Sequence, residues 1–442
     1  MMSSCSCGRS FKSDAALAQH QTDKNRAHKG RASCRLPCSA VSSQMKTEAP
    51  GAAVQTGPGP TNRSSALAKV PQQAWLWKQV RRPIEPVYAI VQTAIVPSAK
   101  EVSSKAGCQL VCSYNWQKGK PLTIRDVVLP LALPPDRGTY FVDQNTELSL
   151  QYPFEPMFRA AASMSQGMSF DDIDIVTNRN SLRKLLEFCA GRYQESFRLN
   201  LHLVRNTLII ERCDKRTHEL IDGSRNSGWG RNYEKASAKF PLGLENSTGH
   251  HRTLRYSLGA LRCAVQFEVD ASYDPDDEGA AHPDTLALPM EKLSIQGAQP
   301  GEARAPPNGL QVETAYVEAR VMRQSTAAEI KSTSNRKAPS QCMPQLWFGR
   351  TRWLIVGHHS EGTFDKTRMT DAAAKFADWE TAHQIALQKL VTVLVELRDA
   401  VRKNGGRHSA AVFERGSGAI RTFGLTSDRQ ALPADLQQEF WT

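Results

Sequence analysis

Two pairs of charged residues, each spaced two positions apart, constrain this 442-residue chain more than any other feature. Glu268 and Asp270 stand in the segment QFEVDA, and Glu329 and Lys331 stand in AAEIKS. Both segments have the pattern of β-strands, in which successive side chains point to opposite faces. Each pair is therefore predicted to share a face, while the residue between its members points into a core. If the two strands are neighbours, three carboxylates and one ammonium group converge on one small patch.

A patch of this kind favours metal chemistry. Clustered carboxylates repel one another and resist burial unless a cation joins them. Their oxygen atoms suit Mg²⁺ or Mn²⁺, and a neighbouring lysine can orient or activate an attacking water molecule. The order E-x-D and then E-x-K resembles the site of PD-(D/E)xK-type nucleases. An ordinary solvated sheet face is the alternative, so the flanking segments decide between the two.

Composition indicates a globular protein with a basic surface. Apolar residues make up 40% of the chain and charged residues 23%, and no run of 18 apolar residues predicts a transmembrane helix. The N-terminus has no apolar signal-peptide core, so secretion is not expected, and the ten cysteines are expected to be reduced. Lys and Arg exceed Asp and Glu by 12, which suits a polyanionic partner such as nucleic acid.

The chain is predicted to divide into three parts. Residues 1–30 are rich in Cys and His, and residues 31–84 form a basic linker of Ser, Ala, Gly and Pro that is predicted to be disordered. Ordered sequence is expected from near Ile84, so that residues 85–442 form the folded domain. Within it, the acidic and Pro-rich segment 274–309 is predicted to be a surface insertion.

The folded domain is predicted to be α+β, with strands dominating its middle. Residues 370–406 are predicted to form a long helix with an apolar stripe, and Gly405 would end it. A shorter helix is expected at residues 181–193. Strands are predicted from alternating or continuous apolar runs at residues 87–96, 197–204, 206–212, 253–259, 261–270 and 352–359.

Four further segments surround the two charged pairs. They are DIVTNRNSLRKLL, GWGRNYEKA, the hairpin HHRTLRYSLGALRCAVQFEVDA, and PQLWFGRTRWLIVGHHSEGTF. In this order, over roughly residues 114–401, they resemble the eukaryotic RNA 5′-end decapping nucleases of the DXO type. The resemblance implies a PD-(D/E)xK-like core of two mixed β-sheets flanked by helices. It also implies removal of defective or non-standard 5′ caps, and 5′→3′ degradation of RNA with a divalent metal ion.

The resemblance assigns roles to individual residues of this chain. For Gln345 and Arg179, an ordinary polar loop residue or a helix cap is the alternative. The resemblance implies that Glu234, Asp270 and Glu329 are ligands to Mg²⁺ or Mn²⁺. It implies that Glu268, Lys331 and Gln345 are catalytic residues, with Glu268 holding a metal-bound water. It also implies that Arg179 binds RNA near the 5′ end.

The chain also departs from the family pattern. Asn178 and Asn180 stand where the family has a tryptophan and a glycine, which puts stacking of a base or cap there in question. Glu329 lies 59 positions after Asp270, a longer gap than is usual in the family, and the 274–309 insertion accounts for it. A non-catalytic RNA- or protein-binding adaptor that retains the nuclease fold is therefore the alternative function.

The implied partners follow from the same resemblance. RNA 5′ ends are the expected substrate, a 5′→3′ exoribonuclease is a candidate protein partner, and no membrane contact is expected. The nucleus is the expected location, with the cytoplasm as the alternative. Up to residue 70 the chain has ten Lys or Arg and three Asp or Glu, and a basic segment of this kind contacts phosphate backbones without sequence preference.

The first thirty residues resemble a C₂H₂ zinc finger. From Cys7 onward, a phenylalanine, a leucine and His20 fall in the register of such a finger, and zinc needs four ligands in tetrahedral array. The candidate zinc ligands are Cys5, Cys7, His20 and His28. One residue separates the two cysteines and seven separate the two histidines, so a decayed finger without zinc is the alternative.

The other histidines form no recognised metal-binding motif. His250, His251, His358 and His359 do not follow an H-E-x-x-H or comparable pattern and are expected to be strand-end or surface residues.

Overall fold

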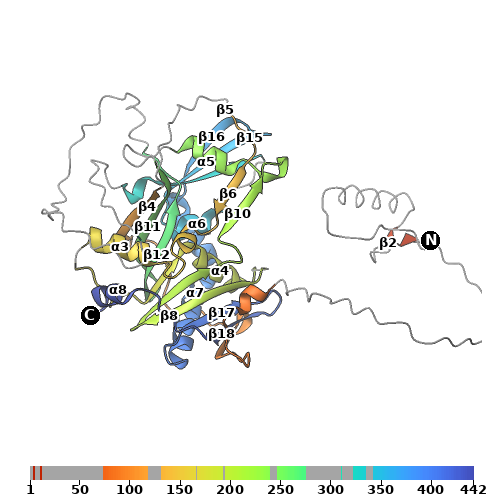
Figure 1. Cartoon of the computed structure of the whole chain (residues 1–442). Helices are drawn as coiled ribbons and strands as arrows, with labels where there is room; N and C mark the ends of the chain where they lie inside the picture. The colour runs from red at the N-terminus through yellow and green to blue at the C-terminus, as the bar shows by residue number, and fades with distance from the viewer. Residues whose placement is uncertain are drawn as a thin grey trace, which may run out of the picture. The chain divides into compact units, whose positions relative to one another are not determined.

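The computed structural model describes two separate units of the chain, Met1–Lys69 and Val70–Thr442 (Figure 1). In the first unit it describes a short antiparallel pair, β1 (Ser3–Ser4) and β2 (Ser10–Phe11). The four candidate zinc ligands, residues 31–72 of the predicted linker and nearly all of the predicted insertion lie outside the described residues. In the second unit the described residues are 73–117, 131–165, 167–192, 195–238, 246–274, 310, 322–334 and 342–442.

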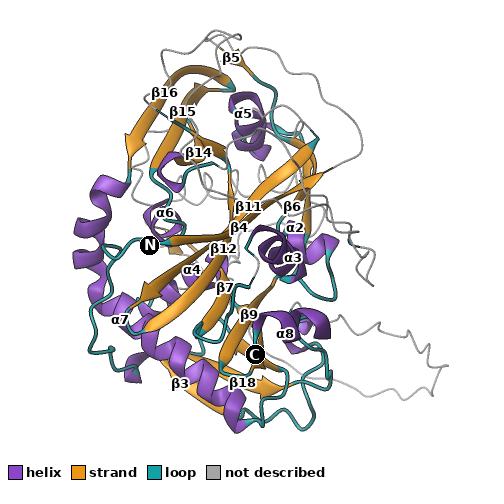
Figure 2. Ribbon diagram, turned by 90° about the vertical axis from the view of Figure 1, so that its left-hand side faces the viewer, coloured by secondary structure: helices purple, strands orange, loops and turns teal. Residues whose placement is uncertain are grey.

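A nine-stranded mixed sheet forms the larger part of the second unit (Figure 2). Strand β7 runs parallel to both β9 and β12, and the other neighbours are antiparallel. The strand order is β3 (Tyr88–Val91), β18 (Ala419–Gly424), β17 (Ser409–Phe413), β8 (Phe197–Val204), β9 (Thr207–Cys213), β7 (Ile175–Asn178), β12 (Leu261–Val269), β11 (Ser247–Leu258) and β4 (Gln109–Gln117).

A second, five-stranded sheet meets the first where β12 ends. The chain leaves β12 at Val269, passes through Asp270 and enters the second sheet directly. The order of this sheet is β13 (Ala271–Ser272), β14 (Ala327–Thr333), β15 (Trp353–Ser360), β16 (Thr363–Asp371) and β5 (Leu131–Ala132). A separate two-stranded sheet pairs β6 (Arg137–Phe141) with β10 (His218–Asp222).

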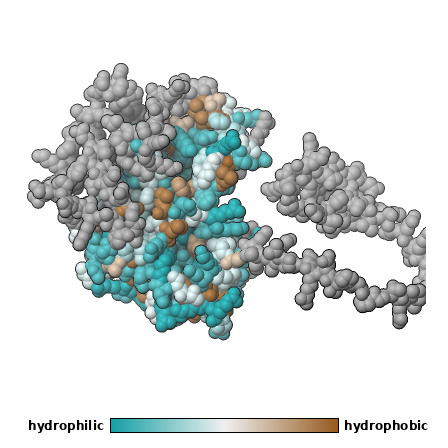
Figure 3. Space-filling model, viewed as in Figure 1, coloured by the Kyte–Doolittle hydropathy of each residue, from teal (hydrophilic) through white to brown (hydrophobic). Residues whose placement is uncertain are grey.

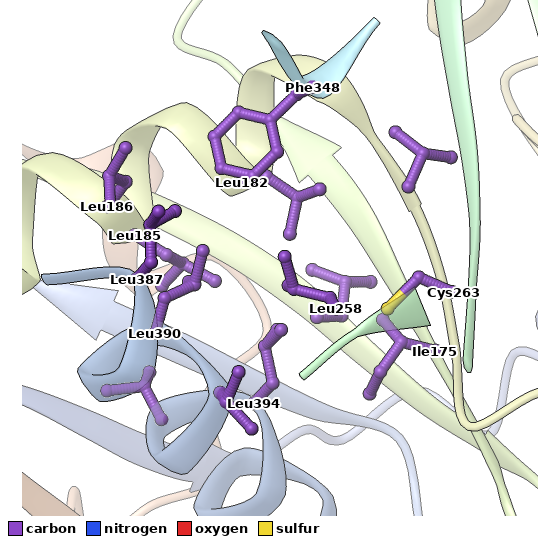
Figure 4. Packing of buried hydrophobic residues seen from close by; sticks show 14 of the residues in the cluster. Ile175, Leu182, Leu185, Leu186, Leu258, Cys263, Phe348, Leu387, Leu390 and Leu394 are labelled. Carbon is purple, nitrogen blue, oxygen red and sulfur yellow. The ribbon is translucent and has the colours of Figure 1, made fainter. Parts of the chain in front are cut away.

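Helices cover both faces of the large sheet, because its central strands are apolar on both sides. Ile175 packs in one buried cluster with α4 (Arg179–Cys189) and α7 (Phe376–Lys403), as Figure 4 shows. The next residue, Val176, points to the opposite face, which α3 (Glu155–Met164) and α8 (Ala434–Phe440) cover. The remaining helical elements are η1 (Ala74–Trp77), η2 (Gln92–Ala94), α2 (Gln144–Leu148), η3 (Arg225–Ser227), α5 (Gly230–Ser237), η5 (Gln324–Thr326), α6 (Met343–Phe348) and η7 (Ala373–Lys375).

The predicted α+β class, with two sheets flanked by helices, is confirmed. Several local boundaries differ from the sequence prediction. The long helix predicted at residues 370–406 begins at Phe376, because Thr370 and Asp371 belong to β16. The strand predicted at residues 253–259 begins earlier, at Ser247. The strand predicted at residues 87–96 ends at Val91, where η2 begins. The folded part also starts before Ile84, because η1 places Leu76 in a buried cluster with Phe423. The local signal is the segment Trp75–Trp77, which brings two tryptophans and a leucine together.

The chain has a formal net charge of +12, and charged and polar side chains cover much of its described surface. On the face shown in Figure 3, hydrophilic residues predominate among those described, and hydrophobic residues form small groups. Within the described part of the chain, no helix combines the length and the apolar character needed to cross a membrane.

The long helix offers a matched test of the core. Leu390 is fully buried beneath the large sheet, whereas Ile385 on the same helix is 66% exposed. Replacing Leu390 with alanine is expected to lower the free energy of unfolding by about 2–5 kcal/mol, since it leaves a cavity. Replacing Ile385 with alanine is expected to change it by about 0.5 kcal/mol or less. Urea unfolding measures both; equal losses would mean that the helix does not pack as described.

Candidate active site

All seven residues to which the resemblance assigns roles lie where the two sheets meet. They come from five different parts of the fold and surround Glu329 on β14. The contributing elements are α4 for Arg179, α5 for Glu234, β12 and the residue after it for Glu268 and Asp270, β14 for Glu329 and Lys331, and α6 for Gln345.

The two charged pairs approach each other by a route that the sequence does not predict. Val269 and Ile330, the residues between the pair members, are buried as expected. However, β12 and β14 belong to different sheets, and Asp270 lies at the crossover between them. Its Oδ2 atom accepts a hydrogen bond of 2.8 Å from the backbone N–H of Ile330. This bond ties the first pair to the second strand.

Glu329 is the centre of the site and is held as an anion. Arg179 Nη1 lies 3.2 Å from its Oε2 atom, while Lys331 Nζ and Gln345 Nε2 both donate to its Oε1 atom. Burial of the carboxyl opposes ionisation, but the charges of Arg179 and Lys331 outweigh it and lower the pKa of Glu329. The side chain is therefore a fixed negative charge at the junction of the sheets.

The pKa values of the other three carboxyl groups are raised instead of lowered. Burial, followed by repulsion from Glu329, raises the pKa of Asp270 well above its ordinary value. Burial and the charge of Glu268 raise the pKa of Glu234 to about 7. The side chain of Glu268 is exposed on one side. On its other sides the surrounding protein excludes water from the carboxyl group, and this desolvation raises the pKa of Glu268 as well. The site thus concentrates more negative charge than its own cations neutralise.

This donor set fits a divalent metal ion. A cation placed among Glu234, Asp270 and Glu329 would relieve the repulsion that raises two of their pKa values. Carboxylate oxygens are the ligands that Mg²⁺ and Mn²⁺ prefer. Among the described residues, no three Asp, Glu, His or Cys side chains already converge as a closed metal site. Lys331 contacts both Glu329 and Asp270, and its Nζ atom lies 3.6 Å from Asp270 Oδ2.

Lys331 is placed to contact a ligand as well as the carboxylates. Its side chain is 39% exposed, in contrast to the buried Glu329. Burial opposes its charge, but Glu329 and Asp270 outweigh that effect and raise the pKa of the ammonium group. The group therefore remains positively charged across the physiological pH range.

Arg179 contacts the site from the protein interior and is shielded from solvent. It is the first residue of α4 and is buried, with Nη2 donating to the backbone carbonyl of Glu268 at 3.2 Å. Its guanidinium also lies 5.2 Å from the ring centroid of Phe267. The neighbouring Asn178 caps the helix, because its side chain accepts a hydrogen bond from the backbone N–H of Ser181. In this structure the cap is thus Asn178, and Arg179 holds Glu329.

Two residues of this region are not identified by the sequence pattern. Arg183 donates to Gln345 Oε1 at 3.3 Å, which leaves the amide nitrogen of Gln345 to donate to Glu329. Its spacing of four positions from Arg179 on one helix is the signal that could have identified it. The expectation for His251 is wrong: it is buried in the middle of β11, directly opposite Glu268 on β12. Helical and strand periodicity alone does not reveal such cross-strand neighbours.

The raised pKa of Glu234 predicts a specific pH dependence. Between its ordinary value of 4.5 and about 7, the folded protein retains a proton that the unfolded chain has released. Stability in metal-free buffer is therefore expected to fall as pH rises through this window, by at most about 1.4 kcal/mol per pH unit for one such group. Replacing Glu234 with glutamine should flatten the fall. Urea unfolding at several pH values in EDTA tests this, and an unchanged slope in the variant would contradict it.

Comparisons with known proteins give one family and several structures of related shape. S. pombe Rai1 in complex with 3′-FADP is 12% identical, with 76% of this chain and 98% of that chain covered and a TM-score of 0.46. Candida albicans Rai1 in complex with pU5 and Mn²⁺ is 12% identical, with 67% and 80% covered and a TM-score of 0.40. K. lactis Dxo1 in complex with manganese is 9% identical, with 77% and 96% covered and a TM-score of 0.39.

No curated protein sequence matches the chain significantly. A family model does match it, over residues 85–441, which include every described element of the site. The chain belongs to the family described as a domain of unknown function, DUF8563.

Proposed function

We propose that this protein is a metal-dependent RNA 5′-end decapping nuclease, which removes caps or 5′ pyrophosphate and degrades RNA 5′→3′. The observation that carries the proposal is the meeting of four carboxylates and Lys331 at the junction of two sheets. They occur in the chain order of the DXO-type motifs. Carboxylates around a divalent cation, with an adjacent ammonium group, are suited to hydrolysis of phosphate esters and anhydrides.

Glu234, Asp270 and Glu329 would hold Mg²⁺ or Mn²⁺ in this proposal. The chemistry that such cations supply at phosphate-cleaving sites is stabilisation of charge on the phosphoryl oxygens and activation of water. Glu329 is suited to this role because it is a fixed anion. Arg179 contacts its Oε2 atom and Lys331 contacts its Oε1 atom. Glu268, the most exposed of the carboxylates, would accept a hydrogen bond from the attacking water.

Lys331 would stabilise the charge that develops on the phosphate. Its ammonium group is already held beside the acidic residues by Glu329, so little reorganisation is needed when a phosphate enters. Gln345 and Arg183 keep the Glu329 carboxylate oriented through the amide of Gln345. Arg179 is engaged with Glu329, so its role in this proposal is to position that carboxylate, with any contact to the RNA 5′ end secondary.

The adaptor remains the second candidate, because the position at which the family has a tryptophan is occupied here by Asn178, whose side chain caps α4. An adaptor would bind RNA or protein without turnover. Location in the nucleus, a 5′→3′ exoribonuclease partner and zinc binding by residues 1–30 are also proposals, and they are supported only by the sequence resemblances and the basic composition of the chain.

The proposal is tested with purified full-length protein and RNAs that carry a 5′-monophosphate, a triphosphate, an unmethylated cap or an NAD cap. With Mg²⁺ or Mn²⁺, at least one of these RNAs should lose its 5′ end, and EDTA should stop the reaction. Turnover of none of them with either metal, in protein that still binds RNA, would favour the adaptor instead.

A further inference from the structure

Two cations on helix α5 lie against one tyrosine ring beside the carboxylate site (Figure 1). The Cζ atom of Arg231 is 4.4 Å from the ring centroid of Tyr140, and the Nζ atom of Lys235 is 4.8 Å from the same centroid. Residues four positions apart share one face of a helix, so α5 presents both cations on the face that meets β6, the strand of Tyr140. We call these three side chains the α5–β6 platform.

Neither cation has an acidic partner among the described residues. Glu219 on β10 stands opposite Tyr140 in the two-stranded sheet, but it forms no ion pair with Arg231 or Lys235. Lys235 is exposed and Arg231 is half-buried, so an anion from solvent can reach both charged groups. Two like charges near one ring repel each other, and the electron-rich face of a tyrosine offsets only part of that repulsion. The platform therefore attracts anions.

The platform adjoins the carboxylates of the candidate active site. Glu234 directly precedes Lys235 on α5. Burial raises the pKa values of Glu234 and Glu268, and the positive charge of Arg231 opposes this effect at both carboxyl groups, which places Arg231 close to both of them. An anion bound at the platform would therefore lie beside a phosphate held at the carboxylates.

Hydrogen bonds fix α5 and β6 to each other before any ligand binds. Asp136, which directly precedes β6, accepts hydrogen bonds from the backbone N–H groups of Arg231 at 3.1 Å and Asn232 at 2.9 Å. The side chain of Asn232 donates in return to the carbonyl oxygen of Pro134 at 2.9 Å. The platform is therefore organised in advance, which reduces the entropy that binding must cost.

The charge of the platform and its position identify the ligand. A single RNA strand offers a row of phosphates, and cations on a fixed surface bind such a backbone without sequence preference. We propose that Arg231 and Lys235, positioned by the ring of Tyr140, form a subsite for the RNA backbone that binds the phosphates neighbouring the one held at the carboxylates. The inference rests on the proposed function for the identity of the ligand as RNA, and it holds for an RNA-binding adaptor as well.

The test measures RNA binding rather than turnover, so its outcome is separate from that of the nuclease assay. Full-length Asp270→Asn protein, whose turnover is expected to be slow, is titrated in Mn²⁺ with a short 5′-phosphorylated RNA that carries a 3′ fluorophore. Fluorescence anisotropy is read at several NaCl concentrations. Replacing both Arg231 and Lys235 with glutamine should weaken binding on the order of 10-fold at low salt. It should also reduce the slope of log affinity against log salt by about 1.4, because each phosphate contact to a single strand contributes about 0.7.

Further variants in the same background separate a positioned subsite from diffuse positive charge. Tyr140→Leu removes the ring but no charge and should weaken binding about 3-fold, whereas Tyr140→Phe should bind as the background does. The matched control is Lys403→Gln, since Lys403 lies 4.7 Å from the ring centroid of Tyr88 on β3, an edge strand of the large sheet. That variant should keep its affinity within about 2-fold. Thermal unfolding checks that each variant is folded, and if Tyr140→Leu is not, the glutamine variants decide. Unchanged affinity and salt slope in the double glutamine variant, or a loss from Lys403→Gln as large as that from Lys235→Gln, would overturn the proposal.

Discussion

Replacing Asp270 with asparagine is expected to lower turnover of a 5′-capped RNA on the order of 10³-fold, while the protein stays as stable as the parent or becomes more stable in metal-free buffer. The two effects have one cause. The carboxylate is among acidic neighbours that raise its pKa, so removing its charge relieves repulsion. Asparagine retains an oxygen that can accept the hydrogen bond from the backbone N–H of Ile330. The loss of activity would come from the weakened metal site alone.

Initial rates with saturating RNA and Mn²⁺ measure the first effect, and urea unfolding in EDTA measures the second. A matched control is Asp172→Asn, since Asp172 forms surface ion pairs with Arg255 and Arg262 away from the carboxylate cluster. That variant should keep its activity. Near-normal turnover by the Asp270 variant would show that the residue is structural and that the site has been assigned wrongly.

Replacing Glu329 with alanine is expected to have a different result, in which stability falls by about 3–5 kcal/mol together with activity. From the sequence alone, all members of a crowded acidic cluster are expected to repel one another, so removing either Asp270 or Glu329 should be harmless to the fold. The structure distinguishes them. Glu329 balances the buried guanidinium of Arg179, and its removal leaves that charge unpaired.

A double-mutant cycle tests this explanation. Glu329→Ala, Arg179→Met and the combined variant are unfolded with urea in EDTA. The combined variant should lose less stability than the sum of the two single losses, because each single substitution leaves one charge buried without its partner. Additive losses would mean that the 3.2 Å contact between Arg179 and Glu329 contributes no coupling in solution.

The sequence predicted those features that depend on local pattern. The periodicity of residues 370–406 predicts α7, and the alternation around Val269 and Ile330 predicts which side chains are buried. Spacing within one strand does not show which sheet that strand joins. For this reason the crossover at Asp270, which brings the two charged pairs together, could not be predicted.

Contacts between residues that are distant in the chain could not be predicted from the sequence either. Arg179 and Glu329 are 150 positions apart, and nothing in either local segment indicates that they pair. His251 was expected at a strand end or on the surface because it fits no metal-binding motif. Its burial, its stacking on Tyr114 and its position opposite Glu268 follow from the pairing of β11 with β4 and β12.

A crystal structure of the full-length protein with Mn²⁺ and a short 5′-phosphorylated RNA, with Mn²⁺ located by anomalous scattering, would test the proposed metal site directly. We expect an anomalous peak bounded by Glu234, Asp270 and Glu329, with the RNA 5′ phosphate in contact with the Mn²⁺ and with the ammonium group of Lys331. RNA bound elsewhere on the surface, with no Mn²⁺ among these three carboxylates, would contradict it.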